Sequence, residues 1–522
     1  MRITAIIENL LRHPIFSWLR PTRSTDEALP VRQQAAAGGG GDQVVLSKAF
    51  EQVAAAYNNG DWSRAEQLCR LMLTASPDYF DALNLLGIIA AQTRRPEEAA
   101  KLLGRAVGVR PDDASALNNL GNLLIELRRF DQALECLDKA ISLEPDLPGI
   151  HSNRGIALRE LGQLRAAIGS FDLAIRIKPD HAEAYSNRGI ALKALRQLDA
   201  AIASYDRAIA IKPDLGQAHW NKAIALLLRG RFEQGWRLYE WGWNTGDRGG
   251  NRQFTQPLWL GVESLKDKTI LLVSEQGLGD TIQFCRYARL VADLGARVVM
   301  EVPESLRGLL DQLDGVAQVL AAGGSLPAFD YYCPLMSLPL AFKTTGTSIP
   351  APPSLKIESG KIAVWSDRLG ARTRPRIGLA WSGRAAHKND RNRSILLADL
   401  VKHLPGQYQY VSLQKELREA DAQTLSENNI VHFGTQLTDF TDTAALCGLM
   451  DVVISVDTSV AHLAGSMGKA VWILLPWVPD WRWLLDRNDS PWYPTAQLFR
   501  QERAGDWAGA LARVRVALEA LA

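Results

Sequence analysis

The stretch ASALNNLGNLLIELRRFDQALECLDKAISLEPDL, residues 114–147, decides the architecture of the first half of the chain. Its glycine, Gly121, has counterparts at Gly87, Gly155 and Gly189, so that glycine recurs at a constant interval. Two alanines and a proline follow each glycine in the same register; after Gly121 they are Ala133, Ala140 and Pro145. A period of this length indicates stacked helix pairs, in which we expect glycine and alanine to face each other where the helices cross, and proline to mark the turn into the next repeat.

This pattern resembles the tetratricopeptide repeat. Looser copies flank the four regular ones, with Ala65, Met72 and Pro77 keeping the register before them and Ala223 and Gly235 occupying it after them. We therefore expect an α-solenoid of about six repeats over residues 45–249, with degraded outer repeats acting as caps.

An asparagine also recurs just before each glycine position: Asn119, Asn153, Asn187 and Asn221. Stacked repeats would align these amides into a ladder that hydrogen-bonds the backbone of a protein or peptide acceptor on the concave face. The alternative is that asparagine is simply a common residue at this position of the repeat.

The composition is that of an ordinary globular protein. The length of 522 residues favours two to four domains, and 47% hydrophobic and 22% charged residues are ordinary proportions. The net charge of +2 gives no indication of a nucleic-acid partner. Five widely separated cysteines argue against a zinc site or a disulfide framework, and we expect no bound metal. No run of about 18 apolar residues occurs, so we expect no transmembrane segment and a cytoplasmic location. Residues 1–44 are predicted to be a helix and a flexible linker, with a membrane-surface anchor as the alternative for the start of this segment.

After residue 249 the pattern changes to alternating strands and helices. Apolar strand candidates lie at 269–274 and 297–303, and, beyond a Pro-rich connection at 347–357, at 376–382, 408–414, 430–434, 452–457 and 470–476. This alternation predicts two doubly wound α/β halves with parallel sheets, 250–355 and 356–522, and a cleft at the carboxyl ends of the strands.

The motifs narrow the chemistry of that cleft. Neither G-x-G-x-x-G nor a P-loop nor a D-x-D triplet occurs, so a dinucleotide cofactor, a P-loop nucleotidase and an acidic metal clamp are unsupported. In VVISVDTSVAHLAGSMG (452–468), a helix is predicted to begin at about Ser459 directly after a strand. The hydroxyls of Thr458 and Ser459 and the first-turn amides would bind an anion, His462 would add a donor, and Asp457 would fix the loop or a ribose hydroxyl. A plain capped helix is the alternative.

Three segments resemble the two-domain glycosyltransferases of GT-B architecture, and more narrowly heptosyltransferase-like domains fused to tetratricopeptide arrays: SEQGLGDTIQFCRYA (274–288), WSG…KNDRNRS (381–394) and DTSVAHLAGSMGKAVWILLP (457–476). FEQGWRLYEWGW (232–243) and PWVPDWRWLLDRNDSPWYP (476–494) are similar to that fused group too.

The resemblance implies roles for particular residues. Asp280 would be the general base for the acceptor hydroxyl, and Lys388 would neutralise the donor phosphate together with the 457–462 turn. His462, in that turn, is our second catalytic candidate. For Asp280, the alternative is that it only caps the helix. Arg391 and Arg393, which lie near Lys388, could also neutralise the phosphate, and the alternative for them is a solvated basic loop. The remaining donor or cleft candidates are Gly279, Gln283, Trp381, Gln414 and Lys415.

The resulting hypothesis is a metal-independent, inverting glycosyltransferase that needs no cofactor besides its nucleotide-sugar substrate and whose repeat array captures a protein acceptor. Two alternatives stay open: a transferase that builds lipopolysaccharide or another glycan, and a repeat scaffold whose transferase half is inactive. The scaffold gains weight because Ser459 stands where heptosyltransferases usually carry glycine in an Asp-Thr-Gly motif.

Overall fold

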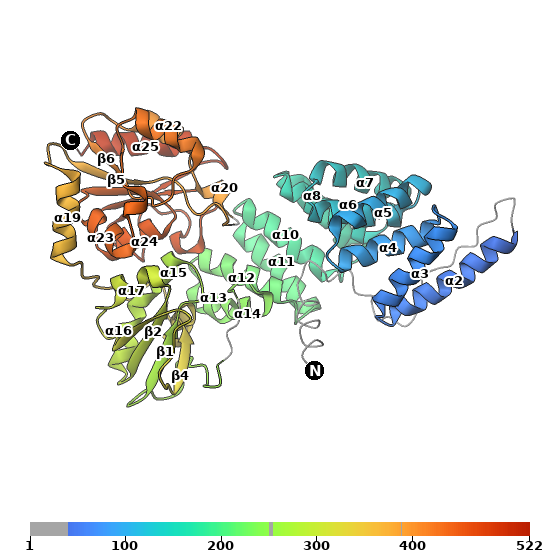
Figure 1. The fold of residues 1–522 in the computed structure, drawn as a ribbon, viewed down its shortest axis with the longest axis horizontal. Coiled ribbons are helices and arrows are strands. Elements are labelled where there is room, and N and C mark those ends of the chain that lie inside the picture. Colours follow the sequence, from blue (N-terminus) through green and yellow to red (C-terminus); the bar gives the residue numbers. More distant parts are fainter. Residues whose placement is uncertain (1–39, 250–253, 388, 522) are drawn as a thin grey trace. The chain divides into compact units, whose positions relative to one another are not determined.

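The computed structural model describes residues 40–249, 254–387 and 389–521 (Figure 1). The chain divides after Asn221 into two compact units. The helix and linker predicted for residues 1–44 lie, up to residue 39, outside the described residues, and so does Lys388.

The first unit is an α-solenoid of antiparallel helix pairs, as the period of the glycines predicts. Consecutive helices pack on each other along the chain, and α12 crosses the boundary at Asn221. The helices are α2 (Gly40–Asn58), α3 (Trp62–Ala75), α4 (Phe80–Gln92), α5 (Pro96–Val109), α6 (Ala114–Glu126), α7 (Phe130–Leu143), α8 (Pro148–Glu160), α9 (Leu164–Ile177), α10 (Ala182–Ala194), α11 (Leu198–Ile211) and α12 (Gly216–Leu228).

The repeat glycines face large side chains, which corrects the expectation that they face alanine. A Cβ added at Gly121 would lie 2.8 Å from Leu137, and one at Gly155 would lie 2.6 Å from the ring of Phe171. In each regular repeat the large partner occupies the same position on the second helix of the pair. The constant spacing thus marks a small residue that makes room for a bulky one, because interiors are filled to close packing.

The second unit begins with the end of α12 and with α13 (Phe232–Tyr239) and α14 (Gly242–Thr245), and continues into a four-stranded parallel sheet. The strand order is β3-β2-β1-β4, with β1 (Thr269–Val273), β2 (Arg297–Val302), β3 (Gln318–Ala321) and β4 (Tyr331–Pro334). The connecting helices are α15 (Leu278–Phe284), α16 (Ala288–Asp293), α17 (Glu304–Leu310) and α18 (Leu338–Ala341).

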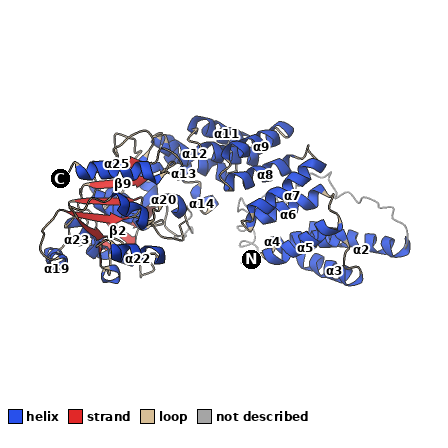
Figure 2. Ribbon diagram, turned by 90° about the horizontal axis from the view of Figure 1, so that it is seen from above, coloured by secondary structure: helices blue, strands red, loops and turns tan. Residues whose placement is uncertain are grey.

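A six-stranded parallel sheet follows, in the order β10-β9-β8-β5-β6-β7. Its strands are β5 (Arg376–Ala380), β6 (Gln409–Ser412), β7 (Val431–His432), β8 (Val452–Val456), β9 (Val471–Leu475) and β10 (Ala496–Arg500). Its helices are α19 (Ser359–Leu369), α20 (Asp390–Arg393), α21 (Leu397–Leu400), α22 (Glu419–Glu427), α23 (Phe440–Gly448), α24 (Ser459–Ser466) and α25 (Trp507–Glu519). Figure 2 shows helices on both sides of the strands.

Each predicted strand of this half forms, since buried parallel strands are mostly apolar, although the one predicted at 430–434 is only two half-buried residues long, β7. The second half of the chain is therefore an α/β region with parallel sheets. Sequence patterning missed β3, β4 and β10. Of the described helices, none combines the length and the apolar character that crossing a bilayer requires.

Candidate functional site

The second sheet has a topological switch point between β5 and β8. From β5 the chain proceeds to β6 and β7 on one side, and from β8 to β9 and β10 on the other. The loops that leave the carboxyl ends of β5 and β8 therefore diverge, and this is the place at which sheets of this kind bind their ligands. The loop after β5 carries Arg393, and the loop after β8 carries Asp457, Thr458 and Ser459.

Helix α24 begins at Ser459, as predicted, and its start lies at this switch point. Thr458 is the N-cap residue in an extended conformation, and its side chain makes no capping hydrogen bond. Instead its Oγ1 lies 3.1 Å from the Oγ of Ser455. The first N–H groups of any helix lack partners within the helix, and α24 does not satisfy them with its own cap, so this end of the helix is suited to an anion.

Asp457 and His462 form a buried pair at this helix start. His462 Nε2 lies 3.6 Å from Asp457 Oδ1, and its Nδ1 lies 2.9 Å from the hydroxyl of Tyr493. Burial opposes the ionisation of Asp457, but the contact with His462 and the charges of Arg482 and Arg393 outweigh it and hold the pKa of Asp457 below its usual range. Asp457 is therefore a carboxylate and a fixed partner of the imidazole.

Arg393 is the described cation of the loop after β5 that reaches this turn. Its Nη1 donates to the carbonyl oxygen of Asp457 at 3.0 Å, and its Nε is buried without a partner among the described residues. A Cβ at Gly383 would lie 2.5 Å from the guanidinium, so glycine leaves the room that Arg393 occupies. Arg391 is exposed on the same short helix.

Asp280 comes from the first sheet, at the start of α15 after β1. Its Oδ2 accepts a hydrogen bond from the Gly277 N–H at 2.7 Å, which closes the helix cap. Its Oδ1 forms an ion pair with Arg482 Nη2. Both oxygens of this carboxylate thus have partners, and the capping role given as the alternative is present.

Arg482 ties the two sheets together, and the sequence interpretation missed it. Its Nε donates to Gln283 Oε1 at 2.7 Å and its Nη1 to Asp480 Oδ1 at 2.7 Å, while its guanidinium lies 4.3 Å above the Trp481 ring. Burial disfavours its charge, but Asp280 and Asp480 more than compensate and raise the pKa of Arg482 above its usual value. The signal that could have found it is an arginine flanked by two tryptophans in the stretch PDWRW.

Gly279 brings α15 and α24 together. A Cβ at this position would lie 2.6 Å from Cδ2 of His462, whose ring also stacks on Trp483 at 5.4 Å. The two helices that start at the carboxyl ends of β1 and β8 therefore touch at their first turns. This contact gathers candidates from two distant parts of the sequence into one neighbourhood: Gly279, Asp280, Gln283, Asp457 and His462.

The polar side-chain atoms of three other candidates, Trp381, Gln414 and Lys415, form hydrogen bonds within the protein. Trp381 is fully buried, and its Nε1 donates to Asp421 Oδ2 at 2.9 Å. Gln414 Oε1 accepts from the N–H of Trp381 at 2.7 Å, which joins the loops after β5 and β6. Lys415 is exposed and donates to the carbonyl of Thr438 at 3.1 Å.

The recurring asparagines bond other side chains of neighbouring repeats rather than one another. Asn153 Nδ2 donates to Asn118 Oδ1 at 2.9 Å, and Asn119 Nδ2 lies 3.4 Å from Asn84 Oδ1. Asn187 Oδ1 accepts from Arg159 Nη1 at 3.1 Å, and Asn221 is buried. Asn119, Asn153 and Asn187 thus use part of their hydrogen-bonding capacity within the array, whereas Nδ2 of Asn221 is buried without a partner among the described residues.

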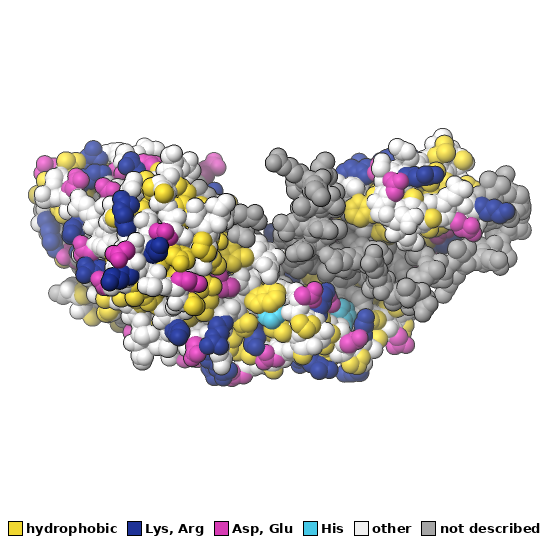
Figure 3. Space-filling model, turned by 90° about the horizontal axis from the view of Figure 1, so that it is seen from below, with side chains coloured by type: hydrophobic (Ala, Val, Ile, Leu, Met, Phe, Trp, Pro, Cys, Tyr) yellow, Lys and Arg dark blue, Asp and Glu magenta, His cyan; other side chains and the backbone are white. Residues whose placement is uncertain are grey.

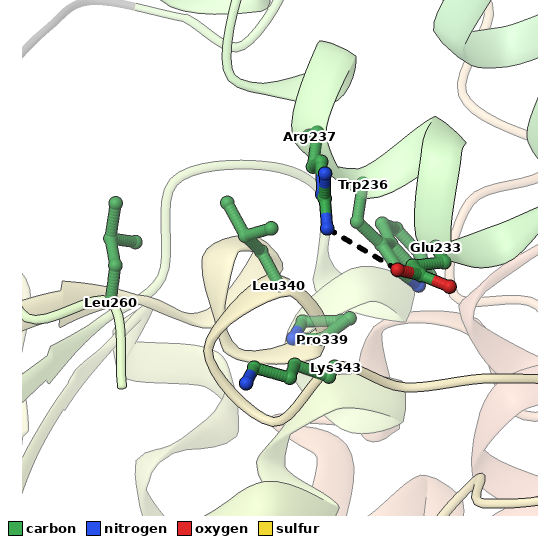
Figure 4. Close-up of a pocket in the computed structure, with 7 residues that line it drawn as sticks. All are labelled: Glu233, Trp236, Arg237, Leu260, Pro339, Leu340 and Lys343. Atoms are coloured by element: carbon green, nitrogen blue, oxygen red, sulfur yellow. Dashed lines mark hydrogen bonds and ion pairs between the residues drawn. The ribbon is translucent and has the colours of Figure 1, made fainter. Parts of the chain in front are cut away.

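A cavity of about 240 Å³ lies elsewhere in the second unit (Figure 4). Trp236 and Arg237 of α13 and Leu340 of α18 line it, with Leu260 on its far side, and Glu233 pairs with Arg237 at 3.2 Å. None of the predicted site residues lines it, so it is separate from the switch point between β5 and β8.

Comparison with known proteins identifies the repeats. Two sequence families, both described as tetratricopeptide repeat, match this chain, one over residues 56–120 and the other over 114–147 and 182–215. Together with the helix pairs, these matches establish tetratricopeptide repeats in the first half of the chain. Such repeats bind peptides or proteins on an extended concave surface.

The chain is 27% identical to Protein FlbA of Caulobacter vibrioides over 323 residues, which cover 56% of this chain and 53% of that protein. It thus spans about half the length of this relative. Among solved structures, a MamA crystal structure is 23% identical and covers 31% of this chain and 94% of its own, with a TM-score of 0.29. YrrB, described as a TPR protein with an unusual peptide-binding site, is 22% identical and covers 33% of this chain and 95% of its own, with a TM-score of 0.29.

Proposed function

We propose that this protein is a glycosyltransferase of GT-B architecture that moves a sugar from a nucleotide-sugar donor to a protein bound by the repeat array. The observation that carries the proposal is the contact of α15 with α24 at Gly279 and His462. It brings the turn that carries the carboxylate Asp280, from the first sheet, next to the helix start at the switch point of the second. The proposal requires a base and an anion-binding helix start close to the same reacting sugar, and this contact supports it.

The donor phosphates would lie at the start of α24. The N–H groups of its first turn and the hydroxyls of Thr458 and Ser459 would donate to phosphate oxygens, and Arg393 would supply positive charge. The Asp457–His462 pair would hold the imidazole beside the same phosphate, with the Tyr493 hydroxyl at its other nitrogen. These groups stabilise the negative charge that grows on the departing nucleotide.

Asp280 would act as general base. It would take the proton of the acceptor hydroxyl as that oxygen bonds to the anomeric carbon, while the bond from this carbon to the phosphate oxygen breaks and the nucleotide leaves with both electrons. A single displacement of this kind inverts the anomeric configuration. Arg482 already binds Oδ1 of Asp280, and the Gly277 N–H binds Oδ2. The acceptor hydroxyl must therefore either use the remaining lone pair of Oδ2 or displace Arg482 from Oδ1.

The test is release of free nucleotide from a panel of ADP-, UDP-, GDP- and CMP-linked sugars, with the full chain and a candidate acceptor protein. We expect one nucleotide class to be released, with sugar mass appearing on the acceptor, and the Asp280→Asn variant to lose about 100-fold or more in rate. Retention of transfer in Asp280→Asn would exclude this residue as the base.

A second candidate, a repeat scaffold with an inactive α/β half, is favoured by the full engagement of both Asp280 oxygens and by Ser459 in the position that the resemblance assigns to glycine. Thermal shift separates the two: a scaffold of this kind shows no stabilisation by any nucleotide.

Basic and acidic side chains are interspersed on the described part of the surface in Figure 3, which offers no single-sign field on that face for steering a partner.

A further inference from the structure

Residues 232–248, which include the FEQGWRLYEWGW motif, pack against the turn that carries Asp280. Trp236 of α13 lies 5.1 Å from the ring of Trp481, the neighbour of Arg482, and its Nε1 donates to the Thr344 carbonyl at 3.2 Å. The Tyr239 hydroxyl donates to Gln276 Oε1 at 3.2 Å. Although the repeat period continues into α13, this helix belongs to the α/β unit.

The end of this segment places a charged side chain in the interior. Arg248 is 0% exposed, and its guanidinium lies 4.2 Å above the ring of Trp243. Its Nη1 donates to Glu240 Oε1 at 2.7 Å, and its Nη2 donates to Glu275 Oε1 at 2.6 Å. A buried charge requires such partners, because desolvation costs several kcal/mol per ion.

Glu275 stands between Arg248 and the site. Its side chain is 7% exposed, and its Oε1 also accepts from the N–H of Met336 at 3.1 Å. Glu275 follows β1 and Met336 follows β4, so this oxygen joins the loops after two neighbouring strands of the first sheet. Slightly further along the same loop, the N–H of Gly277 binds Asp280.

We propose that Glu275, held by Arg248, is a positioning residue that fixes the Gly277–Asp280 turn. The segment 232–248 thereby sets the place of Asp280 without touching a substrate. Its catalytic consequence rests on the proposed function, whereas its structural consequence for the turn does not.

The variants are chosen to separate positioning from general loss of stability. Glu275→Ala removes the acceptor of both hydrogen bonds, whereas Glu275→Gln keeps an oxygen at the same place for Arg248 and Met336. Leu511→Ala, in the core of the second sheet on α25, is the control, because it destabilises the same unit without contact with the turn.

Hydrogen exchange of the full chain, followed over residues 274–284, reports on the turn without any substrate. We expect exchange of the Gly277–Thr281 amides to rise about tenfold or more in Glu275→Ala, and to stay within about threefold of the parent in Glu275→Gln and Leu511→Ala. Equal exchange in Glu275→Ala and Leu511→Ala would overturn the proposal.

With a donor and acceptor in hand, kcat of Glu275→Ala is expected to fall by about 10- to 100-fold while the KM for the donor changes by less than about threefold, and Glu275→Gln is expected to recover much of the rate. A rise in KM with kcat unchanged would contradict positioning of the base. If the parent chain turns over no donor but exchange is faster in Glu275→Ala, the two proposals separate. The exchange result then upholds the positioning of the turn, and the missing turnover rejects the transferase proposal.

Discussion

Replacing Gly279 by alanine tests the contact between α15 and α24 on which the proposed site depends. The added Cβ would lie 2.6 Å from Cδ2 of His462 and 3.4 Å from its Nε2. The imidazole cannot simply swing away, because the Tyr493 hydroxyl lies 2.9 Å from Nδ1 and the ring stacks on Trp483. Either the ring must leave these partners or the two helices must separate.

Two opposing contributions set the magnitude. Overpacking of an interior by one methyl group costs about 1–3 kcal/mol. Replacing glycine by alanine inside a helix returns up to about 1 kcal/mol, and less in the first turn, where Gly279 lies. We therefore expect Gly279→Ala to lower the free energy of unfolding of the second unit by about 1–2 kcal/mol.

The matched control is Gly509→Ala in α25, where an added Cβ meets its nearest atom at 3.8 Å, an ordinary contact. This variant is expected to be neutral or to gain up to about 1 kcal/mol. Urea unfolding followed by tryptophan fluorescence is the assay, because all tryptophans except Trp18, Trp62 and Trp220 lie after residue 221. If Gly279→Ala unfolds at the same urea concentration as Gly509→Ala, α15 and α24 do not cross as closely as described.

Three further predictions concern the array and the ion pairs. Burial raises the pKa of Glu126 to about 7 from 4.5, so the stability it contributes is present below pH 4.5 and lost as the pH rises through 7. The parent array should lose about 1–2 kcal/mol between pH 5 and 8 after allowance for partial exposure, and Glu126→Gln should abolish that slope in urea titrations followed by circular dichroism. Gly155→Ala should lower the stability of the array by about 1–3 kcal/mol, whereas Gly169→Ala, with no atom within 4 Å of its Cβ, should not; equal midpoints would contradict the packing. Arg482→Met should destabilise the second unit by about 3 kcal/mol or more, against less than about 1 kcal/mol for Arg487→Met in a more exposed pair, and a small loss at Arg482 would refute its role as a buried clamp.

The repeat architecture could be predicted because a fixed spacing constrains the geometry of every repeat at once. Each repeat proline lies in the turn after the second helix of its pair, as predicted; these are Pro111, Pro145, Pro179 and Pro213. The partner of each repeat glycine could not be predicted in the same way. Spacing reveals that two helices cross closely, but whether Leu137 or Ala133 fills the gap at Gly121 depends on how the helices rotate about their axes.

The site was predictable in its local parts and not in its connections. The helix start at Ser459 follows from an apolar strand that breaks into polar residues, and the structure has it there. The ion pair between Asp280 and Arg482 joins residues far apart in the sequence, and no local pattern reports such a contact. Trp381 and Gln414 stand at strand ends that pattern reasoning assigns to a cleft, yet burial directs their polar atoms to internal partners.

The most direct test of the central claim is calorimetric titration of the full chain with the nucleotides that these donors would release. The proposed function predicts that at least one of ADP, UDP, GDP or CMP binds in the micromolar range, that Arg393→Met weakens this binding by about tenfold or more, and that Gly509→Ala leaves it unchanged. Absence of binding for every nucleotide, or binding that Arg393→Met does not alter, would contradict a donor-phosphate site at the start of α24.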